Sequence, residues 1–103
     1  GKATFVVTVP AETPATAMVS VTGSFTDNAW TPGAYTLTRQ ENGTYTGEFE
    51  VPAAFEYKYI IGAEGTDWSW DYEEVVSGNR QMVLDLKAND TVEAWKAIPG
   101  VTE

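Results

Sequence analysis

The stretch FEYKYII, residues 55–61, alternates between two kinds of side chain. Its odd positions carry Phe, Tyr, Tyr and Ile, whereas its even positions are Glu56, Lys58 and Ile60. Because successive side chains of a strand point to opposite faces, this period of two predicts a β-strand with its odd residues in the core. Lys58 is then expected on the outer, solvent-facing side of that strand.

Similar alternation recurs on both sides of this stretch. It predicts further strands at 3–9, 17–23, 34–38, 45–51, 80–86 and 91–98. Turn formers separate them, namely a Pro-rich connection at 10–16, an Asn-Gly pair at 42–43 and the sequence KAND at 87–90. Seven or eight short strands with turns about every 8 to 12 residues are typical of an antiparallel, immunoglobulin-like β-sandwich.

Length and composition narrow the possible functions. The 103 residues fit one domain, which we expect to span 1–103 with residues 1–2 and 99–103 frayed or part of a linker. The chain has no Cys and no His, which removes disulfides and the Ser-His and Cys-His nucleophile systems. A net charge of −9 argues against a nucleic-acid partner. No apolar run approaches the roughly 20 residues of a membrane helix, so we expect no membrane insertion.

Three tryptophans fall outside the predicted core faces. Trp30 lies in a loop at 24–33, and Trp68 and Trp70 lie in a long excursion at 62–79. An indole offers a flat apolar surface with a negative face, which suits the C–H groups of a pyranose ring. Lys58 and Asn79 could supply hydrogen bonds to sugar hydroxyls. The alternative is that the tryptophans only close an open end of the core and that Lys58 is merely solvated.

Acidic residues crowd the same excursion. They are Glu64, Asp67, Asp71, Glu73 and Glu74. A glycosidase needs two carboxylates about 5 to 10 Å apart in a deep cleft, and a domain of this size has little material to build one. The spacing of the acids does not match an EF-hand loop either. We interpret them as residues of a solvated loop, and we expect no catalytic residue, no metal and no cofactor.

Several segments match a known family in their order along the chain. They are AMVSVTGSF (17–25), NAWTPGAYTLT (28–38), FEYKYI (55–60), WSWDYEEVVSGNRQMVL (68–84) and DTVEAW (90–95). On these segments the chain resembles the starch-binding domains of carbohydrate-binding module family 20 and the related glycogen-binding domains of family 48. The resemblance covers nearly the whole chain.

The resemblance implies a non-catalytic module that binds α-1,4-linked glucan such as starch, glycogen or maltooligosaccharides. By matching motif, the ligand-binding residues would be Trp30, Lys58, Trp70 or Trp68, and Asn79. Trp70 is preferred because an acid follows it, as in the family, which leaves Trp68 a second surface or a structural role. Such a module could be tethered to a catalytic domain or a cell-surface system, so an extracellular, periplasmic or cell-surface location is favoured. The alternative function is an immunoglobulin-like spacer or protein-interaction domain with no sugar ligand.

Overall fold

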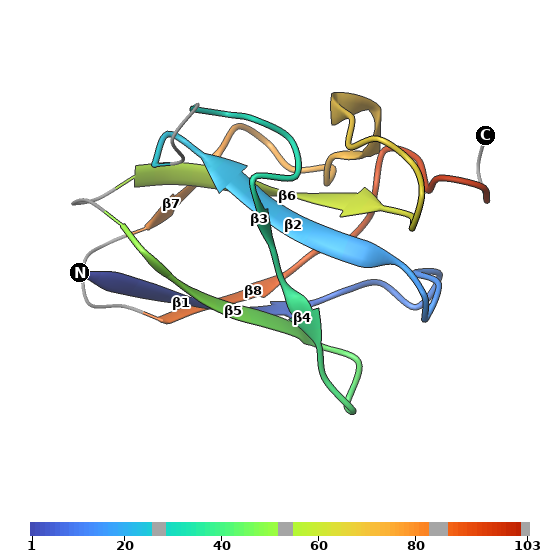
Figure 1. The fold of residues 1–103 in the computed structure, drawn as a ribbon, viewed down its shortest axis with the longest axis horizontal. Coiled ribbons are helices and arrows are strands. Elements are labelled where there is room, and N and C mark those ends of the chain that lie inside the picture. The colour runs from blue at the N-terminus through green and yellow to red at the C-terminus, as the bar shows by residue number, and fades with distance from the viewer. Residues whose placement is uncertain (26–28, 52–54, 83–86, 102–103) are drawn as a thin grey trace.

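The chain forms two four-stranded sheets packed face to face (Figure 1). The computed structural model describes residues 1–25, 29–51, 55–82 and 87–101. In chain order its elements are β1 (Lys2–Thr8), β2 (Met18–Gly23), β3 (Tyr35–Thr36), β4 (Thr38–Arg39), β5 (Tyr45–Glu50), β6 (Phe55–Gly62), the short 3₁₀ helix η1 (Trp70–Tyr72), β7 (Arg80–Met82) and β8 (Lys87–Thr91). One sheet has the strand order β4-β5-β1-β8 and the other β3-β2-β6-β7. The predicted β-sandwich is confirmed, and its paired strands are antiparallel except for the parallel pair β1 and β8.

The core lies between the faces that alternation marks as apolar. In β6, the odd residues from Phe55 to Ile61 are at most 6% exposed. Phe5 of β1 faces them from the other sheet, and its ring centroid lies 5.4 Å from that of Tyr57 and 6.3 Å from that of Tyr59, both edge-on. Edge-to-face rings stabilise a core beyond the area they bury. The period of two in β1 and β6 therefore identified the core correctly.

The predicted strand at 34–38 is two short strands in different sheets. β3 pairs with β2, whereas β4 pairs with β5. Leu37 lies between them, and its side chain is only 4% exposed. The chain therefore crosses from one sheet to the other at this point, with Leu37 packed inside the sandwich.

The predictions for the C-terminal strands were partly wrong. The KAND sequence expected to form a turn belongs to β8, because it pairs with β1 and places Ala88 in the core at 6% exposure. Of the strand expected at 91–98, which lies wholly within the described residues, only Thr91 lies in a strand, as the last residue of β8, and Trp95 forms an isolated bridge with Glu74. The strand expected at 80–86 begins as β7, and residues 83–86 lie outside the described part of the chain.

The excursion predicted at 62–79 connects β6 to β7 and returns to the edge of β6. The Glu74 N–H donates to the Tyr59 carbonyl at 3.0 Å, and Glu73 forms a bridge with Ile60. Ile60, expected on a solvent-facing side, is 0% exposed. The excursion therefore covers part of the outer face of the second sheet, which a strand pattern alone does not indicate.

The N-terminal residues, expected to be frayed or part of a linker, are paired in the structure. Lys2 belongs to β1, and the Gly1 carbonyl accepts the Val51 N–H at 2.8 Å. Over the described residues, the structure contains no helix of the length and apolar character needed to span a membrane.

Candidate functional site

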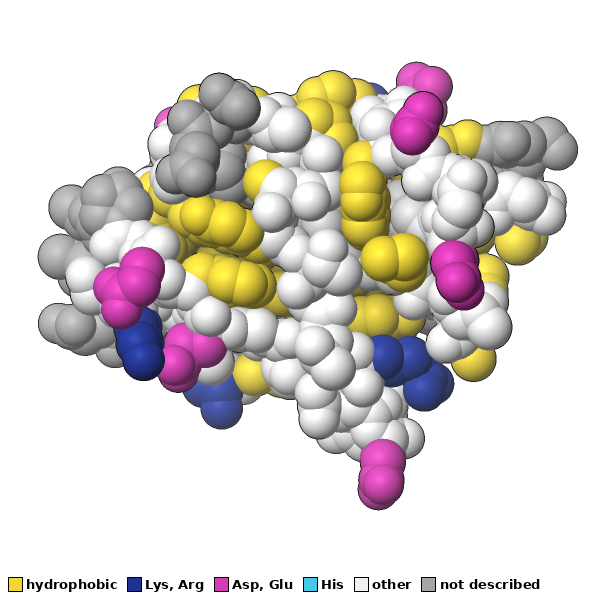
Figure 2. All heavy atoms as spheres, viewed as in Figure 1, with side chains coloured by type: hydrophobic (Ala, Val, Ile, Leu, Met, Phe, Trp, Pro, Cys, Tyr) yellow, Lys and Arg dark blue, Asp and Glu magenta, His cyan; other side chains and the backbone are white. Residues whose placement is uncertain are grey.

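Two tryptophans from separate loops form a tilted pair. The ring centroids of Trp30 and Trp70 are 6.3 Å apart, and their planes meet at 45°. Trp30 lies between β2 and β3, and its N–H donates to the Gly23 carbonyl at 2.9 Å. Trp70 begins η1, whose N-cap is Ser69, with Ser69 Oγ accepting the Asp71 N–H at 3.1 Å. In Figure 2, hydrophobic side chains reach the surface near the top edge, where Figure 1 draws η1, and acidic side chains lie close by.

Trp68 has a different environment from Trp70, although only Ser69 separates them. Its indole lies against the backbone of Gly33 in the loop after β2 and of Gly62 at the end of β6. Ser69 is extended, but the 3₁₀ turn begins at Trp70 and changes the direction of the chain. In a regular strand, two residues this far apart would point to the same face. Here the turn at Trp70 prevents this, so the two side chains do not form one platform.

Lys58 is largely enclosed, contrary to the expectation of a solvent-facing lysine. Its side chain is 12% exposed and its ammonium donates to Glu73, whose side chain is also 12% exposed. The second Glu73 carboxylate oxygen lies 3.4 Å from the ammonium of Lys96, which is 55% exposed. Burial raises the pKa of Glu73, but the ion pairs with the two lysines outweigh burial, so this pKa lies below its usual value.

Asn79 lies on the exposed surface, immediately before β7. Its side-chain amide donates to Glu56 Oε1 at 3.3 Å, so it interacts with the same outward-facing side of β6 that carries Lys58. The structure thus brings Trp30 and Trp70 into contact, and it places Asn79 immediately before β7, the strand that pairs with β6, which carries Lys58. Both side chains donate to glutamates, Lys58 to Glu73 and Asn79 to Glu56.

Two of the five acids expected in a solvated loop are held by basic side chains. Glu64, Asp67 and Asp71 are exposed, whereas Glu73 is enclosed and Glu74 is 1% exposed. The prediction was therefore wrong for Glu73 and Glu74. The available signal was Lys58 and Arg80, two basic residues inside strands that flank the excursion, since enclosed charges require partners.

Glu74 and Arg80 belong to a network that joins the two sheets. Arg80 Nε donates to Glu74 Oε2 at 2.9 Å and its Nη2 donates to Glu74 Oε1 at 2.7 Å. Arg80 Nη1 also lies 3.5 Å from Asp90 Oδ1 on β8. The other carboxylate oxygen of Asp90 accepts hydrogen bonds from the hydroxyls of Tyr57, at 2.6 Å, and Tyr59, at 2.7 Å. The Glu74 carboxylate raises the pKa of Arg80, and burial beside Asp90 raises the pKa values of both tyrosines. The network fixes the segment that carries Glu73 and Glu74 to the body of the sandwich.

Two buried hydroxyls of β2 have no hydrogen-bond partner among the described residues. They are Ser20 Oγ and Thr22 Oγ1, and both residues are 0% exposed. In the β2–β6 register, Thr22 lies opposite Lys58 and Ser20 lies opposite Ile60. These hydroxyls therefore occupy the covered outer face of the second sheet, and they carry a desolvation cost.

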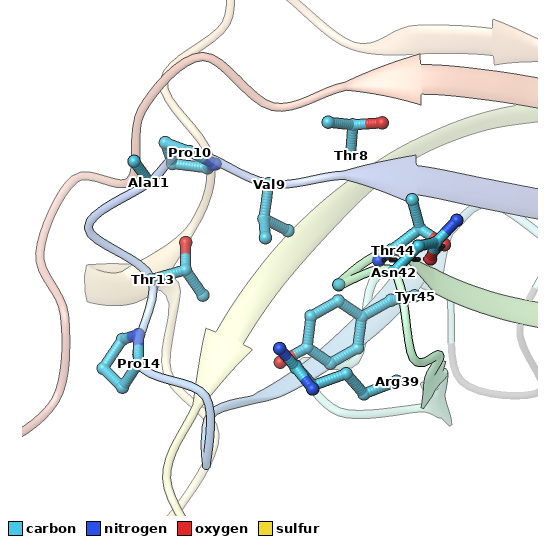
Figure 3. A pocket seen from close by; sticks show the side chains of 11 residues that line it. Thr8, Val9, Pro10, Ala11, Thr13, Pro14, Arg39, Asn42, Thr44 and Tyr45 are labelled. Carbon is cyan, nitrogen blue, oxygen red and sulfur yellow. Dashed lines mark hydrogen bonds between the residues drawn. The ribbon is translucent and has the colours of Figure 1, made fainter.

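A separate pocket of about 220 Å³ lies between the β1–β2 connection and the β4–β5 turn (Figure 3). Arg39, Asn42 and Thr13 are among its lining residues, and none of the three loop tryptophans is. Its aromatic residue, Tyr45, is 2% exposed and donates its hydroxyl to the Ala17 carbonyl at 2.6 Å. This pocket therefore lacks an exposed aromatic face comparable with the Trp30–Trp70 pair. Across the described ranges, no three His, Cys, Asp or Glu side chains gather as metal ligands.

Comparisons with known proteins relate the chain to parts of starch-processing enzymes. No protein-family model matches it. It is 32% identical over 106 residues to an amylopullulanase of Thermoanaerobacterium thermosulfurigenes, and 45% identical over 103 residues to an alpha-amylase of Niallia circulans. These matches cover 95% and 90% of this chain but only 6% and 8% of the relatives.

Solved structures show the same fold. A glycoside hydrolase family 15 glucoamylase from Hypocrea jecorina has a TM-score of 0.68 over 93% of this chain and 17% of its own, at 20% identity. A gamma-CGTase from alkalophilic Bacillus clarkii has a TM-score of 0.60 over 89% of this chain and 14% of its own, at 25% identity. The chain is therefore similar, in sequence and in fold, to short segments of large amylolytic enzymes.

Proposed function

We propose that this domain is a non-catalytic module that binds α-1,4-linked glucan, with Trp30 and Trp70 stacking on neighbouring glucose rings. The observation that carries the proposal is the tilted indole pair, with 6.3 Å between centroids and 45° between planes. Two faces at an angle suit a curved chain of sugar rings better than a flat one. Similarity to segments of an amylopullulanase and an alpha-amylase supports α-linked glucose as the ligand.

Lys58 and Asn79 are the proposed hydrogen-bonding partners of the sugar hydroxyls. A lysine ammonium has three N–H donors, and Glu73 restricts where the Lys58 ammonium can lie. Asn79 is exposed and offers both a donor and an acceptor through its amide. In the proposed complex Lys58 is therefore a positioned donor, while Asn79 can exchange its contact with Glu56 for one with the ligand.

The arrangement of acids supports binding without catalysis. Glu73 is paired with two lysines, and Glu74 with Arg80. A glycosidase requires one carboxylic acid that donates a proton at the scissile bond and a second carboxylate across it. The ion pairs with the two lysines hold the pKa of Glu73 below its usual value despite burial, so Glu73 favours its ionised form and is poorly suited to donate a proton.

A shallow platform predicts modest affinity for a single domain. Few sugar atoms are enclosed, and binding must overcome the ordering of both partners. Tethering raises the effective concentration at a polymer that offers repeated sites. Since the chain spans 6% and 8% of the relatives that it matches, we propose that it works as an accessory domain linked to a catalytic domain or a cell-surface system.

Titration with maltoheptaose or β-cyclodextrin, followed by tryptophan fluorescence, tests this function. We expect a saturable response at millimolar ligand or below, and no response to a β-1,4-linked glucose oligomer of equal length. Replacing an aromatic anchor removes about 2 kcal/mol or more of binding energy, so Trp30→Ala and Trp70→Ala should each raise Kd roughly 30-fold. Lys58→Ala should weaken binding as well.

Matched variants separate loss of the site from loss of the fold. Lys2→Ala removes an exposed lysine from the opposite sheet and should leave Kd unchanged. Trp95→Phe alters an indole that is 7% exposed and hydrogen-bonded to Thr13, and should affect stability without affecting Kd. No saturable response in the wild-type domain would instead favour the spacer or protein-interaction function.

A further inference from the structure

Trp68 forms a close contact between two glycines from distant parts of the chain. A Cβ added at Gly33 would overlap Cγ and Cδ1 of the Trp68 indole and would lie only 2.5 Å from the indole Nε1. A Cβ added at Gly62 would lie 2.8 Å from Cζ3 and 3.1 Å from Cη2. The five-membered ring therefore packs on Gly33 and the six-membered ring packs on Gly62, with no space for a side chain at either position.

These contacts connect the two segments that hold the indole pair. Gly33 follows Trp30 by three residues in the connection from β2 to β3, and Trp68 precedes Trp70 by two residues. The first segment is anchored to β2 by the bond from the Trp30 N–H to the Gly23 carbonyl. The second is anchored to β6 by the backbone contacts of residues 73 and 74. Trp68 links the segments directly, so it constrains one relative to the other.

The backbone of Trp30 shows that its loop is constrained. Its φ is +63°, and no other non-glycine residue in the described ranges has a positive φ. A bulky side chain in the left-handed region is unfavourable, and it persists where the surrounding structure determines it. The contact between Gly33 and Trp68 supplies such a constraint close to Trp30 along the chain.

We propose that Trp68 is a positioning residue, which sets the distance and tilt between Trp30 and Trp70 and does not itself stack on the sugar. Its role in binding rests on the proposed glucan function, whereas its effect on indole geometry does not. If Trp68 is displaced, the two loops move independently, and the ligand must order them on binding. Affinity then falls even though both stacking side chains remain.

The main experiment uses two glycines with the same backbone requirement. Gly33 and Gly43 have φ values of +77° and +87°, so alanine is strained at both. At Gly43 an added Cβ meets only Arg39 Nη2, at 3.8 Å, whereas at Gly33 it meets Trp68. Comparing Gly33→Ala with Gly43→Ala therefore separates displacement of Trp68 from the general strain of an alanine in a turn.

The first readout is circular dichroism of the free domain. Indoles as close as Trp30 and Trp70 couple electronically and give an exciton couplet, which Trp30→Phe and Trp70→Phe should each abolish. Gly33→Ala and Trp68→Phe should reduce the couplet strongly, whereas Gly43→Ala and Trp95→Phe should preserve it. The second readout is Kd for maltoheptaose, which should rise about tenfold in the first two variants because freed side chains must be ordered on binding. Urea unfolding confirms that each variant used is folded.

Each outcome bears on a separate claim. A wild-type couplet in both Gly33→Ala and Trp68→Phe would overturn the positioning role. Loss of binding in Trp68→Phe with an intact couplet would also overturn it, because Trp68 would then contact the sugar itself. If the wild-type domain binds no glucan but the couplet depends on Trp68, the proposed function fails and the positioning of the indoles stands. If Trp68→Phe does not fold, Gly33→Ala against Gly43→Ala decides the question with the indole still present.

Discussion

Replacing Glu74 by glutamine should be among the most destabilising conservative changes in this domain. The Glu74 side chain is 1% exposed, and its carboxylate accepts hydrogen bonds from Arg80 and, at 3.0 Å, from the Tyr59 N–H. Glutamine keeps the shape but turns one acceptor into a donor that faces other donors. It also leaves the Arg80 guanidinium, whose side chain is 20% exposed, without its closest counterion.

The magnitude follows from what remains around Arg80. Removing one partner of a buried ion pair costs about 3–5 kcal/mol. Arg80 retains Asp90 at 3.5 Å and the Thr91 carbonyl at 2.9 Å, which places the expected loss near the lower end. A loss of about 3 kcal/mol corresponds to a fall of roughly 12–24 °C in Tm for a domain of this size. Because small domains have about 5–15 kcal/mol of stability, the variant should still fold at low temperature.

Urea unfolding followed by tryptophan fluorescence measures this loss as a shift in midpoint at unchanged slope. Glu48→Gln is the matched control, since Glu48 pairs with Lys2 at 3.3 Å while the two side chains are 54% and 61% exposed. Such a surface pair contributes at most about 1 kcal/mol. The reasoning is refuted if Glu74→Gln costs less than about 1 kcal/mol, or no more than Glu48→Gln.

Three further changes test other parts of the structure. Thr22→Val should raise the free energy of unfolding by about 1 kcal/mol, measured in urea, because it removes a buried hydroxyl that has no partner among the described residues; a lower midpoint would contradict this. The raised pKa values of Tyr57 and Tyr59 favour the neutral phenols in the fold, so stability should be retained below pH 10.0, the reference value, and fall as pH rises beyond it. Tyr59→Phe should make this loss of stability at alkaline pH smaller. If its urea midpoints fall with rising pH as steeply as those of the wild type, the assignment is wrong. Because the pKa of Glu73 is lowered in the fold, this residue contributes stability above pH 4.5, its reference value, and the contribution should be lost as pH falls through the folded pKa. In Glu73→Gln, the urea midpoint should therefore fall less steeply with decreasing pH than in the wild type.

Strand positions with strong alternation could be read from the sequence, and positions whose role depends on a neighbour could not. The odd residues of β6 are buried as predicted, because burial on one face is encoded in the strand itself. β8 was missed because its residues have low strand propensity, and its place is decided by pairing with β1 and by Asp90 accepting two tyrosine hydroxyls. Leu37 was assigned to one strand because no local pattern marks a crossing between sheets.

The candidate site divides in the same way. Composition and spacing were enough to single out Trp30, Trp68 and Trp70 as unusual, because large indoles in loops rich in turn formers lack a local core. Which of them meet was decided by the contact of the loop after β2 with η1, segments about 40 residues apart in the sequence.

The sequence by itself therefore determined the sandwich, its core faces and the kinds of side chain available for a site. Only the tertiary structure decided that Lys58 is enclosed with Glu73, that Trp30 meets Trp70, and that Trp68 packs on two glycines. The physical reason is that alternation specifies which face of a strand a residue occupies. What covers that face depends on how distant segments pack, and this chain covers it with its own excursion.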